Sequence, residues 1–246
     1  HAVAVVKAGV FTVMRVTYYS FGTEFLRGTW AQYTVMALVI FTIIYGCSRA
    51  LKETHLKRRL AWSTVSNLSY ILFGVVLMTP LGLMAALCHM IFHAVMKICS
   101  FFCAGAVIYK TGRNYVYELD GLGRRMPKTF TIYTISALAL MGVPGLCGFI
   151  SKWNLARAAI ASENTLAYIG VAALLISALL TAIYMLTVSV RAFFPGRDFD
   201  YSTIKDVEDP NWMMLLPLTI FAAAIIIFGL YSTPIVSALK SISALM

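Results

Sequence analysis

The sequence is poor in charged residues, and acidic residues are the scarcest of them. Ten Asp and Glu occur among 246 residues, and each lies in a polar segment or at the end of an apolar stretch. Charged residues make up 12% of the chain, whereas soluble globular domains carry about 25%. Hydrophobic residues make up 60%, and the mean hydropathy is +0.82. This composition excludes a soluble domain and predicts an all-α polytopic membrane helix bundle.

Motifs for redox and metal chemistry are also missing. The five cysteines lie in apolar runs without Cys-x-x-Cys spacing, which argues against a zinc site, an iron–sulfur cluster or a disulfide framework. No glycine-rich nucleotide loop follows a predicted strand. We therefore expect no cofactor, no metal and no catalytic redox group in this chain.

The net charge of +10 would suggest a nucleic-acid partner in a soluble protein. Here half of the twenty Lys and Arg residues gather in two short segments, 49–59 and 110–128. Two apolar stretches joined by a tight turn at 79–82 separate these segments. Both segments therefore fall on one side of the membrane, and the positive-inside rule makes that side the cytoplasm or the mitochondrial matrix. The prediction is a bilayer environment without nucleic acid, in a bacterial or archaeal cell membrane or the mitochondrial inner membrane.

About seven stretches are long and apolar enough to cross a bilayer, which takes about 18 or more residues. The chain opens at His1 inside the first stretch without an initiating Met, so we expect upstream sequence to be missing. The stretches are residues 2–20, 30–48, 62–79, 81–109, 129–161, 165–194 and 211–236.

The stretch 129–161 is too long for one straight crossing. Pro144 lacks an amide hydrogen, and nearby glycines allow an unwound backbone, so the sequence predicts one discontinuous helix. Such breaks at membrane depth line wet cavities and mark ion sites in transporters. The residues predicted to form the break are Gly142, Pro144, Gly145 and Gly148.

Three lysines, Lys7, Lys97 and Lys152, lie within apolar stretches. Inserting each lysine near the centre of a membrane helix costs roughly 2.5–3.5 kcal/mol of free energy. A purely structural protein would rarely keep three such residues. His89 and His93 precede Lys97 at four-residue steps, so the three side chains share one helix face at intervals of about 6 Å. Desolvation and like-charged neighbours disfavour a charged lysine. We predict that these five residues form a proton relay.

Other interpretations of the same residues exist. The row on one helix face could be a polar seam that only joins helices, as in a structural scaffold subunit. His89 and His93 could bind a metal or haem, although a third ligand is lacking nearby and one helix face cannot hold a haem from both sides. Lys152 could extend its side chain to the membrane interface.

Further polar residues are weaker candidates. His1 and Tyr33 could extend the relay, although the sequence favours an interfacial anchor for Tyr33. A polar stripe at the start of the third stretch either binds the neighbouring helix or lines water that leads to the lysines. The stripe consists of Ser63, Thr64, Ser66 and Asn67.

Three segments together resemble a known family. They are LKRRLAWSTVSNLSY at 56–70, HMIFHAVMK at 89–97 and GVPGLCGFISKW at 142–153. In order and spacing they resemble the antiporter-like, proton-translocating membrane subunits of respiratory complex I, of multisubunit sodium/proton antiporters and of energy-converting hydrogenases.

The resemblance implies that this chain is the C-terminal half of a fold built from two inverted five-helix repeats. Residues 1–29 would end the first repeat, 30–194 would form the second, and 195–246 would be a loop and an additional helix, all within one transmembrane domain. Lys152 would be the terminal proton-loading group. Lys97, His89 and His93 would be the connecting relay, and Lys7 with His1 would lie on the central helix.

The family also implies partners and a task. The chain would move protons, or sodium ions, as a non-catalytic subunit of a redox-driven translocase, such as an NADH:quinone oxidoreductase or a hydrogenase, or of a cation/proton antiporter. Its partners would be other membrane subunits, homologous antiporter-like subunits among them. Flavin, iron–sulfur or metal centres are expected in those partners.

Overall fold

The computed structural model describes residues 4–196 and 199–245, and within this part every regular element is a helix. Long helices alternate with short turns, as the apolar stretches predict. The elements are α1 (Val5–Arg15), a π-helical segment (Val16–Phe21), α2 (Thr23–Leu26), α3 (Trp30–Lys52), α4 (Leu56–Val76), α5 (Pro80–Thr111), a 3₁₀ turn (Val116–Glu118), α6 (Leu122–Arg125), α7 (Pro127–Met141), α8 (Cys147–Ala161), α9 (Thr165–Phe193), a 3₁₀ turn (Tyr201–Ile204), α10 (Trp212–Leu230) and α11 (Thr233–Ser243).

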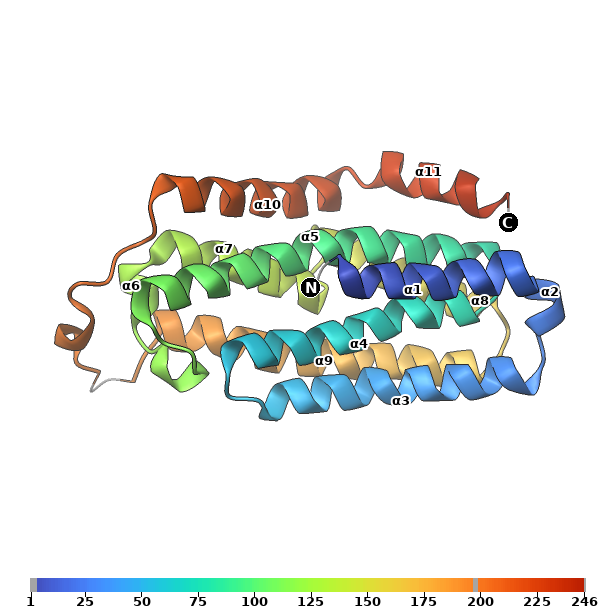
Figure 1. Ribbon diagram of the computed structural model, residues 1–246, viewed down its shortest axis with the longest axis horizontal. Helices are drawn as coiled ribbons and strands as arrows, with labels where there is room; N and C mark the ends of the chain where they lie inside the picture. Colours follow the sequence, from blue (N-terminus) through green and yellow to red (C-terminus); the bar gives the residue numbers. More distant parts are fainter. Residues whose placement is uncertain (1–3, 197–198, 246) are drawn as a thin grey trace.

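The 32-residue helix α5 is the centre of the bundle. Thr79 caps its first turn by accepting a hydrogen bond from the Gly82 amide, and Gly112 ends it in the left-handed conformation that favours glycine. It packs against α4, α7, α8, α10 and α11, while α3 and α9 complete the far side beyond α4 (Figure 1). Residues on several faces of α5 are therefore shielded from the surroundings.

The two basic segments lie together at one end of the bundle, which we call the basic-loop end. The Leu56 amide donates to the Asn114 carbonyl at 2.9 Å, and the Val116 amide donates to the Thr54 carbonyl at 2.9 Å. The turns 22–29, 77–79 and 162–164 lie at the opposite end, on the right in Figure 1. Both basic segments therefore lie at one end of the bundle, and the side of the membrane that this end faces stays a prediction.

Four helices, α3, α5, α9 and α10, are long and apolar enough to cross a membrane. Three predicted stretches fall short of this standard among the described residues. The first corresponds to the short helix α1, and the fifth is divided into the short helices α7 and α8. The third corresponds to α4, which carries the polar stripe. The count of seven spans therefore stays a prediction.

The prediction of one helix over 211–236 is wrong. The helix α10 ends at Leu230, and α11 begins at Thr233. Pro234 occupies the first turn of α11, where its missing amide hydrogen is tolerated. The same proline could not donate to the Leu230 carbonyl, so a continuous helix through this point would lose a backbone hydrogen bond.

Candidate functional site

The predicted row on α5 is present and buried. His89, His93 and Lys97 are each 0% exposed. The rings of His89 and His93 stack with their centroids 5.7 Å apart, so both side chains leave the helix on one face. The four-residue spacing was therefore sufficient to predict this part of the arrangement.

Lys97 is held by uncharged oxygen atoms. Its Nζ donates to Ser63 Oγ at 2.7 Å and to the Leu60 carbonyl at 3.2 Å, both on α4. Within residues 4–196 and 199–245, the one ion pair joins Arg191 and Asp120, near the basic-loop end. A lysine that rests on neutral dipoles alone keeps them as partners whether or not it carries its proton.

A chain of hydroxyl groups continues from Ser63 into α9. Tyr184 Oη donates to Ser63 Oγ at 2.8 Å, and Thr181 Oγ1 lies 3.1 Å from Tyr184 Oη. On the next turn, Ser177 Oγ lies 2.8 Å from the Cys47 thiol of α3. The sequence analysis missed these α9 residues, although their positions at 177, 181 and 184 follow one helix face in an otherwise apolar stretch.

Removing only the Tyr184 hydroxyl tests this chain. Tyr184→Phe preserves the packing of a fully buried ring but leaves Ser63 without that donor. We expect a loss of about 1 kcal/mol in stability, measured by thermal unfolding. Tyr168→Phe, which removes an exposed ring's hydroxyl from the same helix, should leave the stability unchanged.

The other end of the row reaches the broken helix. His89 Nδ1 lies 2.9 Å from Ser151 Oγ on α8. The Tyr70 ring lies 5.3 Å from the His89 ring and 5.2 Å from Lys152 Nζ, measured to the ring centroid in each case. Tyr70 and Ser151 therefore connect the α5 row to the neighbourhood of Lys152. The sequence analysis assigned no role to either residue.

The predicted helix break is present between α7 and α8. Gly142 and Gly145 have φ values of 99° and 89°, which glycine adopts without strain. Gly148, however, was wrongly placed in the break, because the helix resumes at Cys147. A Cβ atom on Gly148 would lie 1.8 Å from the Ala139 carbonyl oxygen. This glycine therefore allows α8 to approach α7 closely.

Lys152 completes the hydrogen bonding at the end of α7. The last four carbonyls of a helix lack partners within the helix. The amides of Gly142 and Val143 donate hydrogen bonds to the Leu138 carbonyl, and the Gly142 amide also donates to the Ala139 carbonyl. Lys152 Nζ donates to the remaining two, Leu140 at 2.6 Å and Met141 at 3.2 Å. The side chain thus turns back to the break, and this contact does not support the interfacial interpretation.

The remaining predicted residues are more scattered. Lys7 is buried on α1, and His1 lies outside the described residues. Tyr33 is exposed near the opposite end, apart from the α5 row. Thr64 and Ser66 bond to carbonyls of Leu60 and Ile43, whereas Asn67 donates to the Ser63 carbonyl. Within the polar stripe, Ser63 accepts a hydrogen bond from the buried Lys97.

A metal site finds no support in this geometry. His89 and His93 come from one helix, and no group of three His, Cys, Asp or Glu side chains suited to a metal occurs in the described part of the chain.

Comparison with known structures defines the class of protein. The fold matches a chain in the structure of the Mrp complex from Dietzia sp. DQ12-45-1b with a TM-score of 0.85 and 20% identity, covering 99% of this chain and 52% of that one. The two chains therefore share one fold, and the four helices of membrane-spanning length make it an integral membrane fold. The family model described as NADH:quinone oxidoreductase/Mrp antiporter, TM, matches residues 2–181. The chain belongs to this family.

Two curated relatives agree with this assignment. The F(420)H(2) dehydrogenase subunit L of Methanosarcina mazei is 35% identical over 239 residues, covering 93% of this chain and 34% of the relative. The NADH-quinone oxidoreductase subunit N of Desulforudis audaxviator is 31% identical over 204 residues, covering 79% of this chain and 40% of the relative. The chain thus spans two fifths or less of the length of these relatives.

Proposed function

We propose that this chain moves protons across the membrane as an antiporter-like subunit of a larger complex. The observation that carries the proposal is the buried row of Lys97, His93 and His89, which continues through Ser151 and Tyr70 to Lys152 at the helix break. Each of the lysines and histidines can hold or release one proton, and neighbouring groups lie close enough for short transfers through hydroxyl groups or water.

Buried polar atoms that lack a hydrogen-bond partner in the protein indicate that water fills the gaps between the side chains of the row. Both ring nitrogens of His93, His89 Nε2 and Asn67 Oδ1 are buried without a protein partner. Buried polar atoms of this kind are normally satisfied, often by ordered water. Water at His93 would connect Lys97 with His89, which do not touch directly.

Protons suit this path better than sodium ions. Hard cations prefer oxygen ligands, carboxylates above all. The row offers lysine and imidazole nitrogens, and no acidic side chain forms an ion pair with it in the described ranges. A lysine of the row also repels a metal cation whenever it carries its proton.

The parent complex is proposed from the relatives. Their names point to NADH-quinone oxidoreductase, F(420)H(2) dehydrogenase or Mrp antiporter assemblies. In either dehydrogenase, partner subunits would carry the flavin and iron–sulfur centres, and homologous antiporter-like subunits would lie beside this chain. An energy-converting hydrogenase, which the sequence resemblance also includes, is a further candidate for the parent complex.

Lys152→Met in the parent complex tests the function. We expect proton uptake into inverted vesicles to fall by about tenfold or more at equal assembly, because a positioned proton-transfer group contributes about 10²–10⁴-fold. Arg157→Gln, at an exposed residue of the same helix, is the matched control and should leave uptake unchanged. Loss of assembly with normal uptake per assembled complex would instead indicate a scaffold, and uptake that requires sodium would contradict proton specificity.

A further inference from the structure

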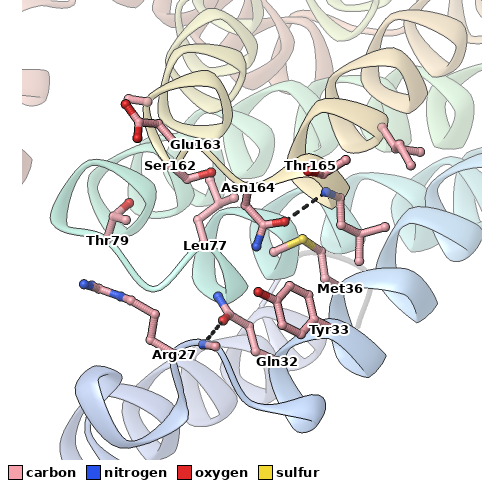
Figure 2. A pocket seen from close by; sticks show the side chains of 14 residues that line it. Arg27, Gln32, Tyr33, Met36, Leu77, Thr79, Ser162, Glu163, Asn164 and Thr165 are labelled. Carbon is pink, nitrogen blue, oxygen red and sulfur yellow. Dashed lines mark hydrogen bonds between the residues drawn. The ribbon is translucent and has the colours of Figure 1, made fainter.

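A polar pocket of about 690 Å³ lies at the opposite end of the bundle, away from the basic loops. Three separate segments form it: the α2–α3 turn with the first turns of α3, the α4–α5 turn, and the α8–α9 turn with the start of α9 (Figure 2). Two non-glycine residues in the described chain, Met78 and Glu163, have positive φ values, 53° and 51°, and they lie on the latter two turns. Such conformations cost energy and cluster at functional sites.

The pocket presents one charge of each sign. Arg27 lines it from one side and Glu163 from the other (Figure 2). The Arg27 guanidinium donates to the Met78 carbonyl, which holds the side chain against the α4–α5 turn. No ion pair joins Arg27 to Glu163, and the described residues include none for either. Both charges are therefore available to a ligand that carries the complementary pair.

This pocket is separate from the candidate proton path. Met36 and Leu77 line it and belong to an apolar cluster that also contains Phe73, Leu155 and Tyr70. Tyr70, which does not line the pocket, contacts Lys152. Tightly packed apolar side chains exclude water, so the pocket is not the mouth of a path to Lys152.

Its surroundings are those of a membrane interface. The long helices α3, α5 and α9 begin here, and their N-termini favour an anionic group. Trp30 beside the pocket is 80% exposed, as expected for an aromatic residue at the level of lipid headgroups. Leu166 and Ile169 form an apolar wall that continues along α9. A suitable ligand has a charged head and an apolar tail.

We propose that this pocket binds the headgroup of an aminophospholipid such as phosphatidylethanolamine. The phosphate lies toward Arg27 and the helix N-termini, the primary ammonium donates to the Glu163 carboxylate, and an acyl chain follows Leu166 and Ile169. A choline headgroup has no N–H to donate to Glu163, and a glycerol headgroup leaves this carboxylate without a cation. The pocket therefore selects the primary amine.

Photolabelling in nanodiscs tests the proposal. The purified parent complex is placed in phosphatidylcholine nanodiscs with trace photoreactive analogues of phosphatidylethanolamine, phosphatidylcholine or phosphatidylglycerol, and labelled peptides are mapped. We expect residues 161–169 to be labelled about fivefold more by the ethanolamine analogue, in line with one partly exposed ion pair. Equal labelling by all three analogues would overturn the proposal.

Variants assign the effect to the two charges. Glu163→Gln should remove the ethanolamine preference. Arg27→Gln should lower labelling by all three analogues, because each carries the phosphate, and Arg157→Gln, outside the pocket on α8, should change neither. Glu163→Gln is the decisive variant if loss of the Arg27 contact to Met78 prevents assembly. A preference that persists in Glu163→Gln overturns the proposal. So does a partner segment found in the pocket by electron microscopy of the complex.

Discussion

Lys97→Met is expected to reduce proton uptake by the parent complex by about 100-fold, within the range for a lost proton-transfer group. Methionine has a similar length and polarizable bulk but cannot carry a proton. The row would then lose the titratable group that donates to Ser63, the first hydroxyl of the chain that leads to Tyr184. The measurement is fluorescence quenching of a pH-sensitive dye in inverted vesicles, normalised to assembled complex.

The complex should still assemble with Lys97→Met. The substitution removes a buried lysine, whose insertion costs roughly 2.5–3.5 kcal/mol. The partners left behind remain satisfied, because the Leu60 carbonyl still accepts from Thr64 Oγ1 and Ser63 still accepts from Tyr184. Normal uptake by an assembled Lys97→Met complex would make Lys97 a packing residue and remove the centre of the proposed path.

Lys97→Arg separates proton exchange from charge. Arginine keeps the positive charge but stays protonated in proteins, so it cannot act as a relay. We expect uptake as low as in Lys97→Met if Lys97 must release its proton. Uptake restored by arginine would indicate that only a fixed positive charge is needed. Lys240→Met, at an exposed site on α11, controls for the loss of a lysine elsewhere.

Gly148→Val is expected to prevent the chain from entering the assembled complex. A Cβ atom at this position would meet the Ala139 carbonyl oxygen at 1.8 Å and the Met96 sulfur at 3.0 Å. The first contact involves backbone, which cannot rotate away as a side chain can. Overpacking typically costs about 1–3 kcal/mol, and a backbone clash this close should reach at least the upper end.

Gly105 provides the matched control for Gly148. It lies within α5, and a Cβ atom there would meet no atom within 4 Å. Gly105→Ala should leave assembly intact and stabilise the helix by up to about 1 kcal/mol. Chain abundance in purified complex, measured by mass spectrometry, compares the two. Equal abundance of Gly148→Val and wild type would contradict the close approach of α7 and α8.

The parts of the fold and site that the sequence predicted are those encoded locally. A four-residue spacing places His89, His93 and Lys97 on one helix face whatever surrounds the helix, and proline with flanking glycines interrupts a helix near Pro144. The contact of Tyr184 with Ser63 joins residues 121 positions apart, and it depends on how α9 packs against α4. No local pattern contains that information.

The error at Gly148 has a similar origin. A glycine in a sequence can mark an unwound backbone or a close approach between elements, and both occur within seven residues here. Gly142 and Gly145 serve the first purpose, with positive φ values, whereas Gly148 is helical and serves the second. Only the position of Ala139 on the neighbouring helix distinguishes them.

The contact of Lys152 with the end of α7 links charge to backbone shape. A protonated amine binds the Leu140 and Met141 carbonyls more strongly than a neutral one, since charged donors form stronger hydrogen bonds and favour the negative end of a helix. By thermodynamic reciprocity, whatever tightens this helix end also favours the proton on Lys152, and whatever pulls α7 away favours its release. A partner subunit that shifts α7 could therefore drive proton release mechanically, without touching the lysine.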